Sequence, residues 1–272
     1  MKPVAIDLFC GLGGWTEGLL PMGWDVVGYD IEAHAYGDMR YPAQLVVQDV
    51  LTLHGSQFKD AALIVASPPC QEYSYMAMPW TKAKAKAAAI RADESGKALA
   101  DLTRLFDACF RIQREACEAA GRHIPMVVEN VRGAIPWVGR SRYNYGSFHL
   151  WGDVPALMPA TSNAQKVGGF RFDGSGRSFQ TASVPHTGVK APGMNWSDPK
   201  KRGQDFTRVA GKHAAEGRKG AGAGAVWFDN NLCQLSSKSS ARKAASAMIA
   251  KIPLPLSRHI GAYYHPLGGI FR

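Results

Sequence analysis

The sequence predicts an α/β protein built on a doubly wound, mostly parallel sheet. Short apolar runs alternate with helical patterns and loops along the first 130 residues, which is typical of strand–helix–strand units. A glycine-rich turn follows the first apolar run, where a parallel sheet leads into a helix. Several of the runs end at an acid or a thiol, as expected where strand carboxyl ends carry the chemistry of the fold.

Five apolar runs are expected to form strands of this sheet. They are Val4–Cys10, Asp25–Tyr29, Leu45–Val47, Ala62–Ala66 and Met126–Val128. Each is short and apolar, which suits a strand that is buried on both faces.

The segments between and after these runs are expected to supply the helices. The clearest is Ala98–Ala120, where apolar residues, Cys109 and Cys117 among them, recur with helical period and so predict a core-facing stripe. Residues 82–91 are rich in Lys and Ala and are expected to form a loop or a frayed helix. Three further helices are expected at Trp15–Met22, Ser240–Ala250 and Ser257–Tyr264.

Composition narrows the class of protein. The chain has 272 residues, a net charge of +10 and five cysteines, with no CxxC pair among them. A disulfide scaffold or a zinc ribbon is therefore not expected. The protein is expected in a reducing compartment. There is no signal-peptide pattern and no apolar run long enough to cross a membrane. The positive charge favours a polyanionic partner, most simply nucleic acid.

Cys70 is the candidate nucleophile. It follows the apolar run Ala62–Ala66 and two prolines, which hold the chain extended and keep it out of a helix. Polar residues follow it, so the thiol is expected on a loop at a strand end rather than in the core. Its reactivity, rather than its packing, is then the property that matters.

Three other features end strands at the same edge. The turn after Val4–Cys10 contains Gly11, Gly13 and Gly14, which would let backbone approach a ligand at a helix N-terminus. Asp30 ends the second strand, at a spacing from the turn that suits an acid binding ribose hydroxyls. Glu129 ends the fifth. Together they predict a nucleoside-bearing cofactor beside a reactive thiol and an acid.

These residues resemble the motifs of the cytosine-C5 DNA methyltransferases. The stretch from Asp7 to Gly14 is similar to the cofactor loop of that family, Ser67–Gln71 and Glu129–Val131 to its two catalytic motifs, and the order along the chain is the same. The resemblance is good over residues 4–133 and loose over residues 240–264. It implies a Rossmann-like class I methyltransferase fold with a small, irregular target-recognition region.

The resemblance also implies the cofactor, S-adenosyl-L-methionine, and the mechanism. Cys70 would add to cytosine C6, Glu129 would hold and protonate the ring at N3, and the target base would be flipped out of double-stranded DNA. The segment from Tyr73 to Arg91 would close over the DNA. No metal is expected. The residues implied to contact the cofactor are Asp7, Phe9, Gly11, Leu12, Gly13, Gly14, Asp30, Ile31, Asp49, Val50, Pro69 and Lys251.

The chain departs from the family pattern after Glu129. The family has an Arg-x-Arg motif well beyond the second catalytic motif, whereas here Arg140 and Arg142 follow Glu129 closely. They are expected to contact the flipped base or its phosphates, and Tyr143–Trp151 is expected to be the next strand. Residues 1–151 would form the catalytic and cofactor-binding domain, residues 152–230 the target-recognition region, and residues 231–272 a segment that returns to the first domain. Such compactness is typical of phage or prophage enzymes.

The position of Lys251 allows more than one identity for the transferred group. It stands where the family has a small residue or an asparagine beside the methionine part of the cofactor. It could point to solvent, to DNA phosphate or to the methionine carboxylate. Alternatively it could pair with an extra carboxylate on the donor, which would then be carboxy-S-adenosyl-L-methionine, and the product would be 5-carboxymethylcytosine.

Two other functions compete. Some relatives of this fold modify tRNA cytosine, although Ser74, after Tyr73, favours DNA. A catalytically inactive DNA-binding homologue would have lost Cys70 or Glu129, and both are present. The protein is expected to be a monomer in the cytoplasm of a bacterium or of a phage-infected host. The DNA target and any restriction partner are not encoded in a readable form.

Overall fold

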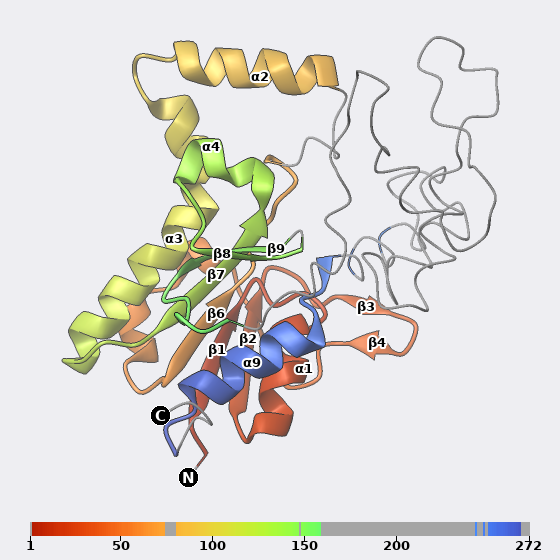
Figure 1. Cartoon of the computed structure of the whole chain (residues 1–272), viewed down its shortest axis with the longest axis vertical. Helices are drawn as coiled ribbons and strands as arrows, with labels where there is room; N and C mark the ends of the chain where they lie inside the picture. Colours follow the sequence, from red (N-terminus) through yellow and green to blue (C-terminus); the bar gives the residue numbers. More distant parts are fainter. Residues whose placement is uncertain are drawn as a thin grey trace, which may run out of the picture. The chain divides into compact units, whose positions relative to one another are not determined.

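The computed structural model describes residues 2–73, 80–146, 148–158 and 250–267, together with residues 243 and 247. Their centre is a seven-stranded sheet of order β5-β2-β1-β6-β7-β9-β8 (Figure 1). Five neighbouring strands are parallel, and β9 runs antiparallel to both β7 and β8. The predicted doubly wound, mostly parallel fold is confirmed. The strands are β1 Val4–Leu8, β2 Asp25–Asp30, β5 Gln44–Val47, β6 Leu63–Ala66, β7 Met126–Val131, β8 Tyr143–Tyr145 and β9 Phe148–Gly152.

Helices cover both faces of this sheet, and short elements connect them. On one face α3 packs against a core of alternate strand residues that includes Ile64 and Met126. On the other, α1 and α9 pack against a second core that includes Leu63 and Val65. The helices and short elements are α1 Gly14–Leu19, α2 Trp80–Ala92, α3 Lys97–Ala120, α4 Ile135–Val138, α9 Leu254–Tyr264, the 3-10 turns η1 Leu20–Met22, η2 Val50–Thr52, η3 Gly55–Phe58 and η4 Arg132–Ala134, and the hairpin β3 Ala35–Tyr36 with β4 Met39–Arg40.

Three predicted elements differ from the structure. The strand predicted at Val4–Cys10 ends at Leu8, because the backbone turns into the left-handed region at Phe9, with φ of 56°. The single strand predicted at Tyr143–Trp151 is wrong, since a turn containing Gly146 at φ 61° divides it into the antiparallel pair β8 and β9. Residues 82–91 lie inside the continuous helix α2, as their alanines favour.

The described residues up to 158 and those from 251 to 267 belong to one compact unit of the chain, whereas residues 243, 247 and 250 belong to a second unit. The predicted target-recognition region at residues 152–230 and the predicted helix Ser240–Ala250 lie almost wholly outside the described residues, as does Ser74. The predicted domain boundaries stay predictions. In the part of the chain that the structure describes, no helix is long and apolar enough to cross a membrane.

The α1–α9 contact is tight enough to test. Gly18 of α1 lies against α9, and a Cβ built on it would stand 1.9 Å from Ser257 Oγ. We therefore expect Gly18→Ala to lower the free energy of unfolding by about 1–3 kcal/mol, as overpacking does. Urea unfolding measures this. Adding Ser257→Gly removes the opposing side chain and should restore part of the loss; no recovery would contradict the contact.

Candidate active site

The Cys70 loop is fixed to the carboxyl ends of β1 and β7. The backbone N–H of Ser67 donates to the carbonyl of Leu8 at 3.1 Å, which extends the β6 ladder by one residue. The Asn130 side-chain amide donates to the Pro68 carbonyl at 3.0 Å. The N–H of Tyr73 closes a turn on the Cys70 carbonyl at 3.0 Å. The thiol is therefore held, half-buried, at the edge where the sequence placed it.

Glu129 and Cys70 interact electrostatically at this edge. Glu129 is 8% exposed, and its burial raises the pKa of the carboxyl group to about 8, although a hydrogen bond with the Ser67 side chain opposes the rise. Burial raises the pKa of the Cys70 thiol to about 11, and the charge of Glu129 adds to that rise. Near neutral pH both groups therefore hold protons.

Three residues outside the predicted set support this pair. Ser67 bonds Glu129 and also accepts a hydrogen bond from Trp15 Nε1 at 2.9 Å, which ties the catalytic edge to α1. Asn130, 1% exposed, holds Pro68. Ser67 and Asn130 lie within the two catalytic motifs of the family resemblance, and their nearness in sequence to Cys70 and Glu129 could have predicted a supporting role. Nothing in the sequence singled out Trp15.

The three glycines of the turn have different roles. A Cβ at Gly11 would meet no atom within 4 Å, so this residue borders open space. A Cβ at Gly13 would lie 2.5 Å from Pro42, and one at Gly14 would lie 2.4 Å from the backbone of Ile252. Gly13 and Gly14 are thus required by close packing against the chain itself, whereas only Gly11 leaves room for a ligand.

Two acids flank the turn. Asp30 Oδ2 accepts a hydrogen bond from the Gly11 N–H at 2.9 Å, which fastens the turn to β2. Asp7 is fully buried and accepts from the Thr16 hydroxyl at 2.7 Å through Oδ2. Its other oxygen, Oδ1, has no hydrogen-bond partner among the described residues. Burial raises the pKa of Asp7 to about 8, and the charge of Asp30 adds to the rise.

The remaining residues predicted to contact a cofactor lie at strand ends or beside the turn. Ile31, directly after β2, is 69% exposed, which is unusual for isoleucine and leaves an apolar surface at the edge. Asp49 follows β5, where its side chain accepts from the Leu51 N–H at 2.9 Å. Val50 and Leu12 are buried. On the Cys70 loop, Pro69 is exposed.

Lys251 lies against the start of α1. Its Cγ is 2.9 Å from the position of a Cβ on Gly14. Its ammonium group forms an ion pair with Glu17 Oε1 at 2.5 Å. The structure therefore brings Lys251 to the glycine turn and gives its charge a carboxylate partner.

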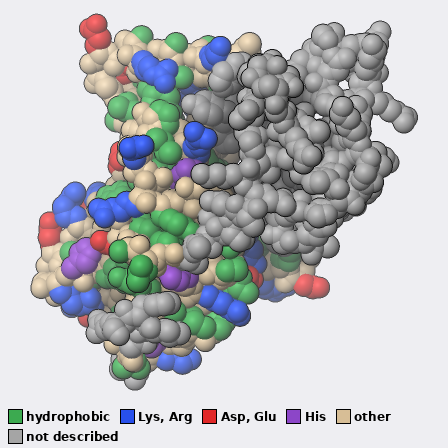
Figure 2. All heavy atoms as spheres, viewed as in Figure 1, with side chains coloured by type: hydrophobic (Ala, Val, Ile, Leu, Met, Phe, Trp, Pro, Cys, Tyr) green, Lys and Arg blue, Asp and Glu red, His purple; other side chains and the backbone are tan. Residues whose placement is uncertain are grey.

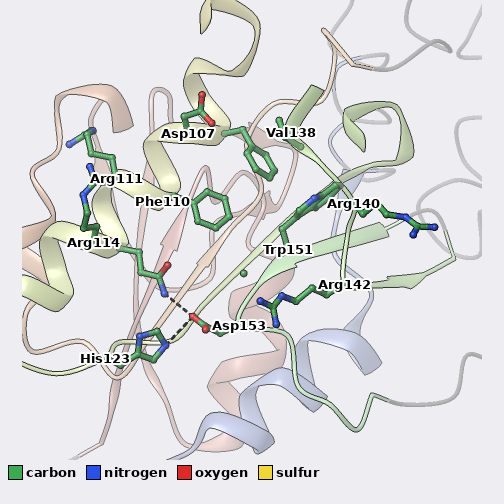
Figure 3. Close-up of a pocket in the computed structure, with 13 residues that line it drawn as sticks. Asp107, Phe110, Arg111, Arg114, His123, Val138, Arg140, Arg142, Trp151 and Asp153 are labelled. Atoms are coloured by element: carbon green, nitrogen blue, oxygen red, sulfur yellow. Dashed lines mark hydrogen bonds and ion pairs between the residues drawn. The ribbon is translucent and has the colours of Figure 1, made fainter. Parts of the chain in front are cut away.

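Arg140 and Arg142 lie elsewhere. They line a cavity of about 680 Å³ with Phe110 of α3 and Trp151 of β9 (Figure 3). Trp151 belongs to the core on the α3 face, whereas Glu129 bonds Ser67, whose hydroxyl meets α1 on the other face. The described contacts do not bring either arginine to Cys70 or Glu129, and their role in base contact stays a prediction.

No cluster of His, Cys, Asp and Glu among the described residues is placed to hold a metal ion. The chemistry that this edge can support follows from one thiol, one carboxylic acid and a glycine turn flanked by two further acids.

Comparison with known proteins finds one family model that matches part of the chain. The family model for C-5 cytosine-specific DNA methylases matches residues 4–87, which include the glycine turn, Asp30 and Cys70. A search of curated proteins finds no match.

The chain is also similar to parts of solved structures. One is an E. coli prophage protein named as a DNA modification methyltransferase, with 23% identity and a TM-score of 0.32 over 49% of this chain and 33% of that one. Another is S. pombe Dnmt2 methyltransferase, with 16% identity and a TM-score of 0.32 over 51% and 37%. A third is the Entamoeba histolytica methyltransferase EhMeth, with 16% identity and a TM-score of 0.31 over 51% and 41%. The chain spans well under half of the length of each.

The coupling between Glu129 and Cys70 can be measured in the protein without a substrate. Glu129→Gln removes a negative charge that disfavours the thiolate, so the pKa of Cys70 should fall. Between about pH 8 and about pH 10, where Glu129 is ionised in the wild type, iodoacetamide should then alkylate Cys70 faster in the variant, as followed by peptide mass spectrometry. Glu118→Gln, an exposed change on α3, is the control. An unchanged alkylation profile in Glu129→Gln would mean that the two groups do not interact.

The buried Asp7 should make the stability of the ligand-free protein depend on pH. Its folded pKa of about 8 lies above the ordinary value of 3.8, so its contribution is most favourable at low pH and is lost as pH rises through about 8. Asp7→Asn cannot ionise, and it can still accept the Thr16 hydrogen bond. Thermal unfolding should therefore show a smaller drop in Tm from about pH 6 to about pH 9 for this variant than for the wild type. Equal drops would place the titration elsewhere.

Proposed function

We propose that this protein transfers a methyl group from S-adenosyl-L-methionine to C5 of cytosine in double-stranded DNA. The observation that carries the proposal is the meeting of Cys70 and Glu129 at the carboxyl edge of the sheet, beside the glycine turn. The family match over residues 4–87 supports it.

The residues around the turn fit such a donor. Asp30 and the exposed Ile31 at the end of β2 suit a ribose and an adenine ring, and Asp49 at the end of β5 suits the exocyclic amine. The unpartnered Oδ1 of Asp7 suits a cationic group. When bound, the donor supplies an electrophilic methyl group on a sulfonium centre.

The burial of Cys70 and Glu129 suits them to different roles, Cys70 as the nucleophile and Glu129 as the acid. Cytosine C5 is a weak nucleophile until another nucleophile adds to C6. Glu129, protonated near neutral pH, donates its proton to N3 as the Cys70 sulfur adds to C6, and the thiol proton passes to solvent. C5 then carries the electron density of an enamine and takes the methyl group as the bond from that methyl to the donor sulfur breaks. The C5 proton then passes to solvent while the C6–sulfur bond breaks and frees the Cys70 thiolate, and N3 returns its proton to Glu129, which restores the aromatic ring and the acid.

DNA as the partner is supported by charge and by access. The chain carries +10, and Figure 2 shows Lys and Arg side chains on α2 and on the surface beside it. α2 follows the Cys70 loop in sequence, and its Lys82 is exposed. Because sulfur must reach the face of the ring, the base has to leave the duplex stack. We infer base flipping and phosphate contacts by α2 on this ground.

Expression in a bacterial host tests the reaction. DNA from cells that make the wild type should yield 5-methylcytosine on digestion and mass spectrometry, and DNA from cells that make Cys70→Ala should yield none. The control is Cys117→Ala, since Cys117 lies on α3 and bonds the backbone at Ile124. Methylation that survives Cys70→Ala would overturn the mechanism.

The same digests separate the alternatives. 5-Carboxymethylcytosine would assign the carboxylated donor and give Lys251 the role of pairing with its carboxylate. Label transfer from the donor to tRNA, but not to duplex DNA, would assign RNA modification. Only 5-methylcytosine in DNA agrees with the proposal.

A further inference from the structure

A chain of three hydroxyl and carboxyl groups lies buried beneath the glycine turn. Asp7 of β1 accepts from the Thr16 hydroxyl of α1, and Thr16 Oγ1 is 2.6 Å from the Tyr41 hydroxyl. All three residues are buried, with Asp7 and Thr16 at 0% exposure and Tyr41 at 7%. Because the single Thr16 hydroxyl proton is directed to Asp7, the Tyr41 hydroxyl is the donor to Thr16.

Tyr41 is held rigidly in this position. A Cβ on Gly28 of β2 would stand 2.3 Å from Tyr41 Cζ, and one on Gly13 would stand 3.1 Å from Tyr41 Cδ2. The ring therefore fills the space that two glycines leave, between the second strand and the cofactor turn. Only glycine at both positions lets the hydroxyl reach Thr16.

No cation among the described residues is placed to neutralise Asp7. The groups that act on it are the Thr16 hydroxyl from α1, which favours the carboxylate, and the Asp30 carboxylate from β2, which disfavours it. Burial raises the pKa of Cys10 and of Tyr41, and the charge of Asp7 adds to both rises. No cation is among the groups that shift the pKa of Asp7, and Oδ1 has no partner among the described residues. A buried acid with a free oxygen is suited to receive a cation.

We propose that Tyr41 and Thr16 are positioning residues that hold Asp7 ready for a cationic group of the donor, and that donor binding drives a proton from Asp7 to solvent. The inference rests on the proposed function, since it takes the donor to bind at the glycine turn. Tyr41 polarises Thr16, Thr16 stabilises the carboxylate form of Asp7, and the incoming cation replaces the proton.

The direction of the pH effect follows from linkage. A cation beside Asp7 lowers its pKa below the ligand-free value of about 8. At pH values between the bound and free pKa, each binding event releases close to one proton, and affinity rises by up to about tenfold per pH unit. Above about pH 8 the carboxylate is already ionised and affinity levels off.

Titration calorimetry of S-adenosyl-L-methionine into the full-length wild-type protein tests this. At about pH 7 the binding enthalpy should differ between phosphate and Tris, two buffers with different ionisation enthalpies. The slope of binding enthalpy against buffer ionisation enthalpy should correspond to about one proton released for each donor bound. A slope near zero overturns the proposal. Absence of binding in either buffer would instead count against the proposed function.

Variants locate the proton. Asp7→Asn should abolish the buffer dependence. Tyr41→Phe keeps the ring but removes the donor to Thr16, and at about pH 7 it should weaken donor binding by about fivefold, the worth of one hydrogen bond. Tyr36→Phe is the matched control, because its hydroxyl faces His34 instead, and it should bind as the wild type does. Equal affinity of Tyr41→Phe and Tyr36→Phe would overturn the positioning role, and buffer dependence that persists in Asp7→Asn would assign the proton to another group.

Discussion

The candidate active site depends on Ser67. Its backbone N–H extends the ladder between β6 and β1, which determines where the strand ends and the Cys70 loop begins. Its hydroxyl accepts from Trp15 of α1 and bonds Glu129 of β7. One residue thus joins the strand that carries the nucleophile, the strand that carries the acid and the helix that begins at the cofactor turn.

The same edge carries two buried acids that are costly to ionise. Asp7 and Glu129 both have pKa values raised to about 8 by burial, so the ligand-free edge stores protons rather than charge. Each acid has a distinct use for its proton in the proposed reaction. Glu129 passes its proton to the cytosine ring, whereas Asp7 loses its proton when a cation arrives. Burial keeps both acids protonated near neutral pH, and the same burial lowers the stability of the fold at high pH.

Much of the site could be predicted from the sequence because strand ends are local features. The Pro-Pro-Cys loop after an apolar run located Cys70, and a parallel sheet necessarily brings the end of β7, with Glu129, to the same edge. The supporting contacts could not be predicted, since Trp15 meets Ser67 across 52 positions and Asn130 meets Pro68 across 62. These contacts depend on packing, which the local pattern does not encode.

The arginines show a second limit. Whether Arg142 faces Glu129 or α3 depends on side-chain alternation in β8, and that depends on where the chain turns. Gly146, with φ of 61°, places the turn between β8 and β9 and pairs Tyr143 with Leu150. Tyr143 then joins the α1–α9 core and leaves Arg142 at the cavity beside α3. A strand running unbroken to Trp151 would have been paired differently.

Lys251 illustrates how two positive charges can share one edge. A sulfonium donor would meet repulsion from a bare ammonium group beside Gly14, but Glu17 lies 2.5 Å from that ammonium, so the pair is close to neutral. Asp30, and Asp7 once it gives up its proton, then favour a cation beside the turn. A carboxylated donor would have to draw Lys251 from Glu17, whose side chain is 44% exposed and easily solvated, so the loss would be small. The ion pair thus removes the electrostatic objection to an ordinary methyl donor.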